Sequence, residues 1–292
     1  MITRRDLAQR LEAGLVWLLF QALRRLSLDQ ASAVGGWIGR TIGPRLRVSR
    51  RALANLARIF PDLSPERHRA ILRGMWDNLG RNAGEFPHLQ SLAYDDQARF
   101  TLLGREHIEA ARDDNRPGLF FSGHLGNWEI ALPWVRHVGI VLHPIYRAAN
   151  NPHLDWLYAH SRADGSDPIP KGAAGARKAI TALLRGDHLG MLVDQKMNDG
   201  LAVPFFGIPA MTAPAIAAFA LRFRCPVIPW RIIRTNGAHF TLLVEPPLAL
   251  PDSGDRAADS LALMTSINQI LERWIRETPE QWLWLHRRWP NP

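Results

Sequence analysis

The stretch Gly118-Leu-Phe-Phe-Ser-Gly-His-Leu-Gly-Asn-Trp-Glu129 joins a short apolar run to a turn and then to a helix start. Residues 119–121 are typical of a buried strand, and the glycines that follow mark a turn. Two residues five apart on one α-helix are about 140° apart around its axis, so His124 and Glu129 can meet only if the histidine lies on a loop. The sequence therefore predicts a strand, a loop carrying His124, and a helix whose N-cap is Asn127.

A histidine beside a carboxylate is typical of general-base catalysis, in which the imidazole takes a proton from a hydroxyl group. We interpret His124 as such a base and Glu129 as the carboxylate that orients it. The alternative is that His124 only packs against its neighbours and that Glu129 is a solvated helix residue. The spacing by itself does not choose between the two, because a lone His-x4-Glu is a weak motif.

The composition is that of a folded domain with a large core. The chain has 292 residues, of which 47% are apolar, and this fraction is too high for disorder. The single cysteine, Cys225, excludes an internal disulfide framework and is expected to be a buried structural thiol. The histidines form no His-x3-His pair and have no cysteine partner, so we expect neither a metal ion nor a cofactor.

The positive charge is concentrated at the N-terminus. Residues 1–58 hold 11 arginines and 3 acidic residues, a net of +8, whereas the whole chain carries +9. Apolar segments at 7–26 and 31–43, with Trp17 and Trp37, accompany this charge. Basic, tryptophan-bearing amphipathic helices are typical of proteins that lie on an anionic membrane surface. We expect residues 1–60 to form such helices and residues 61–292 to form the main domain.

Three other interpretations of this N-terminal segment stay open. It could be a helical subdomain packed on the core, an arm that binds nucleic acid, or a single tilted span over 7–26. The nucleic-acid interpretation is disfavoured, because basic and aromatic residues are not interleaved on a strand platform. The span is disfavoured because the uninterrupted apolar core, Ala13 to Phe20, is far shorter than the roughly 20 residues that a bilayer requires.

After a helix expected over 64–83, short apolar runs alternate with helical patterns. The strands are expected at 99–103, 117–121, 139–146, 189–193, 226–234 and 239–245, and the helices at 105–112, 127–137, 150–161, 172–185, 212–223 and 257–276. This alternation predicts an α/β fold with a central, mostly parallel sheet flanked by helices on both faces.

Ligands of open α/β sheets gather at the carboxyl ends of the strands. Besides the His124 loop, Arg147 and the pair Asp194-Gln195 fall at such ends. Arginine at this position can hold a phosphate, although a surface salt bridge is the commoner case. Asp194 can ligate, orient or cap.

Two further segments carry aromatic residues. The stretch 203–214 is rich in proline and glycine and is not expected to form a regular element. Its Phe205 and Phe206 could line a groove for an acyl chain or belong to the core, and Thr212 is a good N-cap for the next helix. The C-terminal residues 279–292 carry three tryptophans and form either a docked tail or another interfacial patch.

Together these segments resemble the late acyltransferases of lipid A biosynthesis, the lauroyl and myristoyl transferases of the bacterial inner membrane. That family looks like a branch of the wider glycerolipid acyltransferase superfamily, whose usual pair is His-x4-Asp, and Glu in place of Asp marks the lipid A branch. The matching blocks, in order, are Ser122 to Glu129, Tyr146-Arg147, Asp194-Gln195 and Val203 to Thr212.

The resemblance implies an O-acyltransferase on the cytoplasmic face of the inner membrane, without a covalent intermediate. His124 would deprotonate a hydroxyl of a lipid A precursor, and Glu129 would orient the imidazole. The hydroxyl would attack the thioester of an acyl carrier protein or of acyl-CoA. Arg147 would bind a phosphate or sugar of the acceptor. The other implied substrate contacts are Asp194, Gln195, Phe205, Phe206 and Gly207, with Asn127 and Thr212 as structural support.

Three alternatives remain at this stage. The same chemistry could act on a phosphatidylinositol mannoside, an ornithine lipid or a lysophospholipid, and the segment Lys196 to Gly200 is a variant loop that could alter the choice of acceptor. The protein could be a non-catalytic membrane-surface binding protein. A hydrolase with Ser122 as nucleophile is disfavoured, because no Gly-x-Ser-x-Gly elbow is present.

Overall fold

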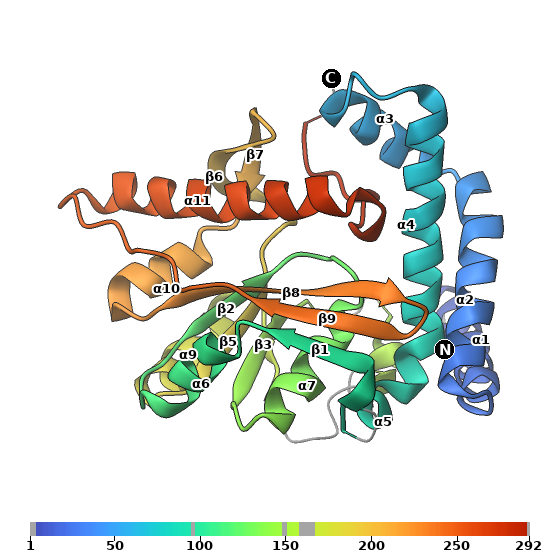
Figure 1. Cartoon of the computed structure of the whole chain (residues 1–292), viewed down its shortest axis with the longest axis horizontal. Helices are drawn as coiled ribbons and strands as arrows, with labels where there is room; N and C mark the ends of the chain where they lie inside the picture. Colours follow the sequence, from blue (N-terminus) through green and yellow to red (C-terminus); the bar gives the residue numbers. More distant parts are fainter. Residues whose placement is uncertain (1–3, 95–96, 148–150, 158–166, 291–292) are drawn as a thin grey trace.

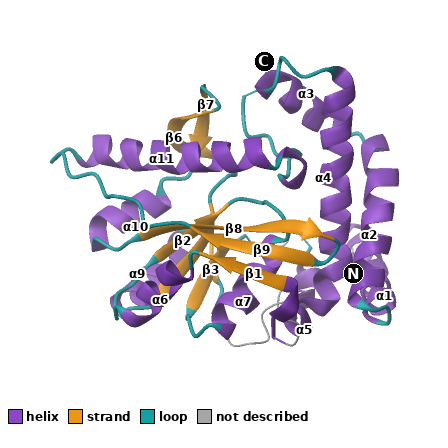
Figure 2. Cartoon of the chain, in the orientation of Figure 1, coloured by secondary structure: helices purple, strands orange, loops and turns teal. Residues whose placement is uncertain are grey.

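A seven-stranded sheet forms the centre of the protein in a computed structural model that describes residues 4–94, 97–147, 151–157 and 167–290 (Figure 1, Figure 2). Its strand order is β1-β9-β8-β2-β5-β3-β4. The β8–β9 pair is antiparallel and the other neighbouring strands pair in parallel, so the predicted fold class is confirmed. The strands are β1 (Phe100–Leu103), β2 (Leu119–Ser122), β3 (Leu142–Tyr146), β4 (Ile169–Pro170), β5 (His188–Leu192), β8 (Val227–Asn236) and β9 (His239–Val244).

Helices cover both faces of this sheet, because the central strand β2 is apolar on both sides. Successive side chains of a strand point to opposite faces. Phe120 packs in one hydrophobic cluster, and its neighbours Leu119 and Phe121 pack in the other. The Phe120 face is covered by α6 (Arg105–Asp113) and α7 (Ala131–His137). The opposite face is covered by α9 (Ala173–Leu184), α10 (Ala215–Phe223) and α11 (Arg256–Glu277).

The N-terminal part of the chain is helical, as predicted, and lies at one end of the sheet (Figure 1). Its helices are α1 (Arg4–Arg24), α2 (Leu28–Ile42), α3 (Ser49–Ile59) and α4 (Pro65–Glu85), and a short α5 (Leu89–Tyr94) follows. Helix α2 packs closely along α4, because glycines face each other: a Cβ atom on Gly80 would lie 2.1 Å from the carbonyl oxygen of Gly35. The division of the chain at residue 60 stays a prediction.

The segment expected to be irregular is instead a hairpin. Strands β6 (Lys196–Phe205) and β7 (Ile208–Thr212) pair antiparallel beside α11, as a separate two-stranded sheet. A two-stranded ribbon has free edges and therefore tolerates prolines, and Pro204 and Pro209 face each other in it. Phe206 and Gly207 form the turn with φ of 53° and 71°, as tight hairpins require.

Two helix starts also differ from the predictions. Thr212 ends β7, and α10 begins only after Pro214, so the expected N-cap role of Thr212 is wrong. The helix expected from residue 127 begins as a short 3-10 turn, Trp128–Ile130, before α7, and the Asn127 side chain does not cap it. Of the helix expected over 150–161, residues 151–157 are described: they begin with a short 3-10 turn, Pro152–Leu154, and are α-helical over 155–157. The rest of this prediction lies outside the described residues.

The C-terminal segment after α11 is a docked tail, and the interpretation as an interfacial patch is wrong. Trp282 and Trp284 are fully buried, and Trp289 is 4% exposed. The tail is held by α3, where the Asn55 amide donates to the carbonyl oxygens of Trp284 and His286. At its end the Trp289 indole donates to the carbonyl of Phe205 in the hairpin. The tail therefore ties the N-terminal helices to the main domain.

Candidate active site

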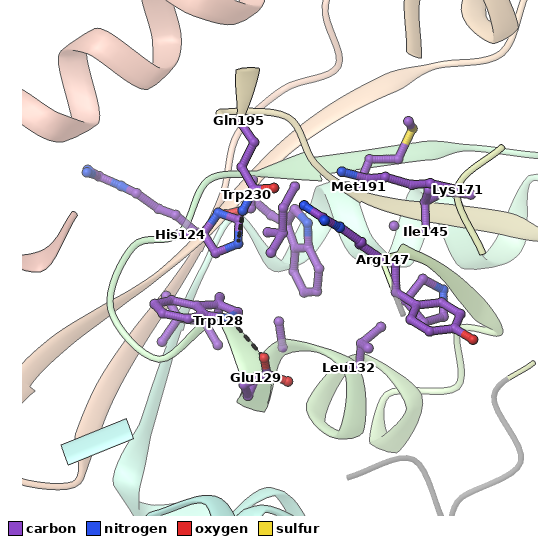
Figure 3. A pocket seen from close by; sticks show the side chains of 18 residues that line it. His124, Trp128, Glu129, Leu132, Ile145, Arg147, Lys171, Met191, Gln195 and Trp230 are labelled. Carbon is purple, nitrogen blue, oxygen red and sulfur yellow. Dashed lines mark hydrogen bonds between the residues drawn. The ribbon is translucent and has the colours of Figure 1, made fainter. Parts of the chain in front are cut away.

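A pocket of about 390 Å³ opens at the carboxyl ends of β2, β5 and β3. Three predicted site residues line it from the loops that follow these strands: His124 after β2, Gln195 after β5 and Arg147 after β3 (Figure 3). These loops converge because β2, β5 and β3 are neighbours in the sheet. The wall between them is largely apolar and includes Leu132, Ile145, Met191 and Trp230.

The imidazole of His124 is paired with Asp194, not with Glu129. The His124 Nδ1 atom lies 2.7 Å from Asp194 Oδ1, and the His124 backbone N–H donates to Oδ2 at 2.8 Å. This pairing follows from the strand order: Ser122 of β2 lies opposite Leu192 of β5, so the two loops run side by side. A proton on Nδ1 leaves Nε2 as the acceptor, and Nε2 lies on the side of Gln195, 3.3 Å from its amide nitrogen.

Glu129 lines the same pocket without a hydrogen bond to His124 in the described structure. Its Oε1 accepts a hydrogen bond of 2.9 Å from the indole N–H of Trp128 (Figure 3). The Trp128 ring in turn contacts the His124 ring edge to face, with the centroids 5.0 Å apart. The predicted orienting contact is therefore absent here, and the carboxylate of Glu129 faces the pocket.

Asp194 lies fully buried behind His124. Burial favours the neutral acid, but the charge of His124 and the hydrogen bonds from it outweigh burial and hold the pKa of Asp194 well below its usual range. A third donor, the indole N–H of Trp282, reaches Oδ2 at 2.8 Å. Asp194 is thus a fixed, ionised carboxylate that holds His124 from the side opposite the pocket.

His286 of the C-terminal tail packs on the His124 ring, with the centroids 5.0 Å apart. Burial lowers the pKa of His286 to about 4, so this imidazole is neutral at neutral pH. Within the described ranges, His124, Asp194 and His286 are the group whose ligand atoms lie close enough to hold a metal ion, all within 4.8 Å of one another. The hydrogen bond between His124 and Asp194 already uses one ligand atom of each residue. We therefore assign no metal ion to this group.

Two cationic side chains line the other end of the pocket. Tyr146 of β3 lies opposite Pro170 of β4, so the next residues, Arg147 and Lys171, are neighbours. Both side chains extend toward the pocket in Figure 3. Desolvation, together with the nearby charge of Arg147, lowers the pKa of Lys171. The sequence did not single out Lys171, because the two-residue strand before it is too short to give a pattern.

The structure does not bring Phe205, Phe206 and Gly207 to the pocket. They lie at the turn of the β6–β7 hairpin, and Phe205 is fully buried. Its ring stacks on Trp289, with the centroids 5.5 Å apart, so the alternative of core packing describes Phe205. Thr212 is buried in the same region, where its hydroxyl accepts a hydrogen bond from Arg288.

A buried polar network supports the His124 loop from the side of α4. Glu85 is fully buried and forms an ion pair with Arg234 of β8 through both of its oxygens. The amide of Asn127 donates to Glu85 at 2.7 Å. Asn78 and Asn82 of α4 donate to the carbonyl of Gly126. These partners are more than 40 residues from the loop in the sequence, so no local sequence pattern could predict the contacts.

Position 126 of the loop can be occupied only by glycine. Its φ is +56°, and a Cβ atom there would lie 2.1 Å from the carbonyl oxygen of Ile232 on β8. The loop is therefore pressed against the sheet while its carbonyl faces α4. This close approach fixes the backbone two residues after His124.

Comparison with known proteins identifies the family. The model of the bacterial lipid A biosynthesis acyltransferases matches residues 4–291. The lipid A biosynthesis lauroyltransferase of Escherichia coli (strain K12) is 25% identical over 94% of this chain and 89% of its own length. A lipid A biosynthesis acyltransferase of Haemophilus influenzae is 26% identical over 87% of this chain and 81% of its own. The chain belongs to the bacterial lipid A biosynthesis acyltransferase family.

Proposed function

We propose that the protein transfers a fatty acyl group from an acyl thioester to a hydroxyl group of a lipid A precursor, with His124 as the general base. The observation that carries this proposal is the His124–Asp194 pair at the end of a pocket that is apolar along its wall and cationic at its far end. The family and its relatives, which are named for lipid A acylation, support the acceptor class. The thioester is carried by an acyl carrier protein or by coenzyme A.

The reaction balances without a cofactor. The Nε2 atom of His124 takes the proton of the acceptor hydroxyl, and the oxygen attacks the thioester carbonyl carbon. A C–O bond forms, the C–S bond breaks, and the imidazolium returns its proton to the departing sulfur. Asp194 keeps the proton of the neutral imidazole on Nδ1 and stabilises the imidazolium as it forms. The amide of Gln195, which lies next to His124 Nε2, moves away when the acceptor hydroxyl binds there.

The cationic end of the pocket is suited to an anionic group of the acceptor. Arg147 offers a planar fork for phosphate oxygens, and Lys171 adds a second positive charge beside it. Two adjacent like charges are unfavourable by themselves, and a bound phosphate relieves this repulsion. We propose that these two residues hold a phosphate of the acceptor while its hydroxyl lies against His124.

The N-terminal helices provide the surface for membrane attachment in this proposal. Of the 17 large apolar side chains that are exposed in the described residues, 11 lie between Leu7 and Leu46, on α1, α2 and the turn after them. Residues 1–58, which include these helices, carry a net charge of +8. Among the described helices, none has the length and apolar character to span a bilayer. We propose attachment to the anionic cytoplasmic face of the inner membrane.

Helix α1 also connects this surface to the active site. The side chain of Asn151, a few residues after Arg147, donates to the backbone of Gln9 and to the carboxylate of Glu12 on α1. A lipid that leaves the membrane beside α1 therefore meets Asn151, four positions after Arg147 in the chain. This connection supports an acceptor that is embedded in the membrane rather than free in solution.

The experiment that tests the chemistry is an acyl-transfer assay with tetra- and penta-acylated lipid A precursors and a panel of acyl carrier protein and acyl-CoA donors. His124→Ala is expected to lower kcat by about 10²–10⁴-fold, the loss typical of a general base. A loss of less than about tenfold contradicts the assigned role. In a deletion strain, mass spectrometry of the lipids separates the acceptors: an unchanged lipid A excludes the lipid A proposal and favours another glycolipid or a lysophospholipid.

Two carboxylate variants decide which residue orients His124. Asp194→Asn keeps the size of the side chain and removes the charge, so kcat is expected to fall by at least about 10²-fold because the imidazolium loses its stabilising partner. Glu129→Gln is the matched control, and we expect it to raise KM more than it lowers kcat, since Glu129 faces the pocket. A larger loss of kcat in Glu129→Gln than in Asp194→Asn refutes this assignment.

A further inference from the structure

The indole N–H of Trp282, in the C-terminal tail, donates to the carboxylate that holds the catalytic histidine. We propose that Trp282 is a positioning residue of the acyl-transfer reaction, which fixes the Asp194 carboxylate so that its other oxygen meets His124. The proposal deepens the function proposed above and rests on it. It gives Trp282 a role in the active site, although none of the described residues of the C-terminal tail lines the pocket.

The hydrogen bonds of Asp194 are divided between its two oxygens in a defined way. Oδ2 accepts from the backbone N–H of His124 and from Trp282 Nε1, each at 2.8 Å. Oδ1 accepts from His124 Nδ1 at 2.7 Å. Two donors on Oδ2 fix the rotation of the carboxylate and direct Oδ1 at the imidazole. Because Asp194 is fully buried, removal of a donor leaves a charged oxygen without that hydrogen bond.

The backbone around Trp282 holds the catalytic loop as well. Leu125 and Trp282 form an antiparallel bridge, and the Leu283 N–H donates to the carbonyl of His124 at 3.1 Å. One residue earlier, the carbonyl of Gln281 accepts from the Gly126 N–H. The tail therefore behaves as a short strand beside the loop, and the same segment positions both His124 and its partner Asp194.

The neighbouring tryptophan of the tail provides an internal control. Trp282 and Trp284 are both fully buried, and their rings contact each other with centroids 4.7 Å apart. Each indole N–H has a hydrogen-bond acceptor, but Trp284 donates to the carbonyl of Pro279 within the tail. Replacement of either residue by phenylalanine removes a similar ring area and one hydrogen bond. Only the change at Trp282 removes a donor from Asp194.

The test compares the full-length variants Trp282→Phe and Trp284→Phe. A hydrogen bond to a charged group is stronger than one between neutral groups. We therefore expect Trp282→Phe to lower kcat by at least about tenfold with KM for the acyl donor unchanged, and Trp284→Phe to stay within about twofold of the wild type. Thermal unfolding of both variants reports the loss of packing, which we expect to be similar in the two.

A readout independent of turnover is the tautomer of His124. Histidine labelled with ¹⁵N in the ring, with His124→Gln to assign the signal, reports whether the proton is on Nδ1. The wild type and Trp284→Phe are expected to show a single Nδ1-protonated form, and Trp282→Phe a mixture of tautomers. If the protein acylates no lipid A precursor, the function is wrong, and this measurement still decides the positioning role.

Two results overturn the proposal: equal losses of kcat in the two variants, or a Trp282→Phe enzyme with wild-type kcat and an unchanged His124 signal. Where Trp282→Phe does not fold, the benzothienyl analogue of tryptophan at position 282 keeps the shape of the ring and replaces the N–H by sulfur. Its kcat is expected to fall by the same factor of about tenfold or more, and a wild-type kcat overturns the proposal.

Discussion

The ion pair between Glu85 and Arg234 allows a quantitative test of how the catalytic loop is held. Glu85 is fully buried, and each of its oxygens accepts two hydrogen bonds: Oε1 from Ser32 and Arg234, Oε2 from Asn127 and Arg234. In Glu85→Gln, the new NH₂ group takes the place of one of these oxygens and cannot accept the two hydrogen bonds there, whichever way the amide is turned. Arg234 is then a buried charge without its anionic partner. Removal of one member of a buried pair costs about 3–5 kcal/mol.

This free energy converts into a shift of the melting temperature. The entropy of unfolding is about 2.1 cal/mol/K per residue, or about 0.6 kcal/mol/K for a chain of this length, so Glu85→Gln is expected to melt about 5–8 °C lower. The assay is thermal unfolding by calorimetry, with the acyl-transfer rate measured on the same samples. We also expect kcat to fall, because Asn127 of the catalytic loop loses the charged carboxylate of α4 that accepts its hydrogen bond.

The matched control is Glu109→Gln, which removes a surface carboxylate at 3.8 Å from Arg105. The side chains of Arg105 and Glu109 are 66% and 46% exposed, so the melting temperature of Glu109→Gln is expected to stay unchanged. The double variant Glu85→Gln with Arg234→Gln is expected to lose less than the sum of the single losses, since no unpaired charge remains. A Glu85→Gln protein that melts within about 1 °C of the wild type refutes the reasoning, because 1 °C corresponds to only about 0.6 kcal/mol.

Three further predictions concern titration, reactivity and substrate binding. The pKa of His286 is about 4 in the folded protein and about 6.5 in the unfolded chain, so the unfolded state binds the extra proton and stability falls as the pH drops from 6.5 to 4. His286→Phe is expected to reduce this loss of stability by about 3 kcal/mol, as measured by urea unfolding at the two pH values. An unchanged dependence of stability on pH contradicts the prediction. Burial raises the pKa of Cys225 to about 11, so a thiol reagent at pH 7.5 is expected to label it only after denaturation, and rapid labelling of the native protein is the contrary result. Lys171→Met is expected to raise KM for a phosphorylated acceptor about tenfold with kcat nearly unchanged, because a charge-assisted contact to the acceptor is lost. The same change in KM for an acceptor without phosphate refutes the contact between Lys171 and the phosphate.

The order of strands and helices could be predicted from the sequence because each apolar run carries its own pattern. The six expected strands all appear in the sheet, and the loops after β2, β3 and β5 converge on one pocket. Local pattern failed where proline and glycine lie within a ribbon, as in the β6–β7 hairpin. It failed again for Phe205, because an aromatic residue in a glycine-rich stretch gives no sign of which layer covers it.

The partner of His124 could not be predicted from spacing, and the reason is topological. The sequence favoured Glu129 because it is near in the chain, but the carboxylate nearest in space follows the adjacent strand β5. Sequence reasoning placed Asp194 at the site, where it could ligate, orient or cap, but did not pair it with His124, because the pattern of a single strand does not reveal the strand order. The same holds for Trp282 and Glu85, whose contacts cross most of the chain.

These long-range contacts have a common consequence for how the site is built. The His124 loop is held from three directions by segments that are distant in sequence: α4 through Asn82, the β5 loop through Asp194, and the C-terminal tail through Trp282. None of these three residues lines the pocket. The pocket side, which carries Glu129 and Nε2 of His124, is thereby left to the substrates. An imidazole fixed from behind needs little reorganisation when the acceptor hydroxyl arrives, and such preorganisation is what general-base catalysis requires.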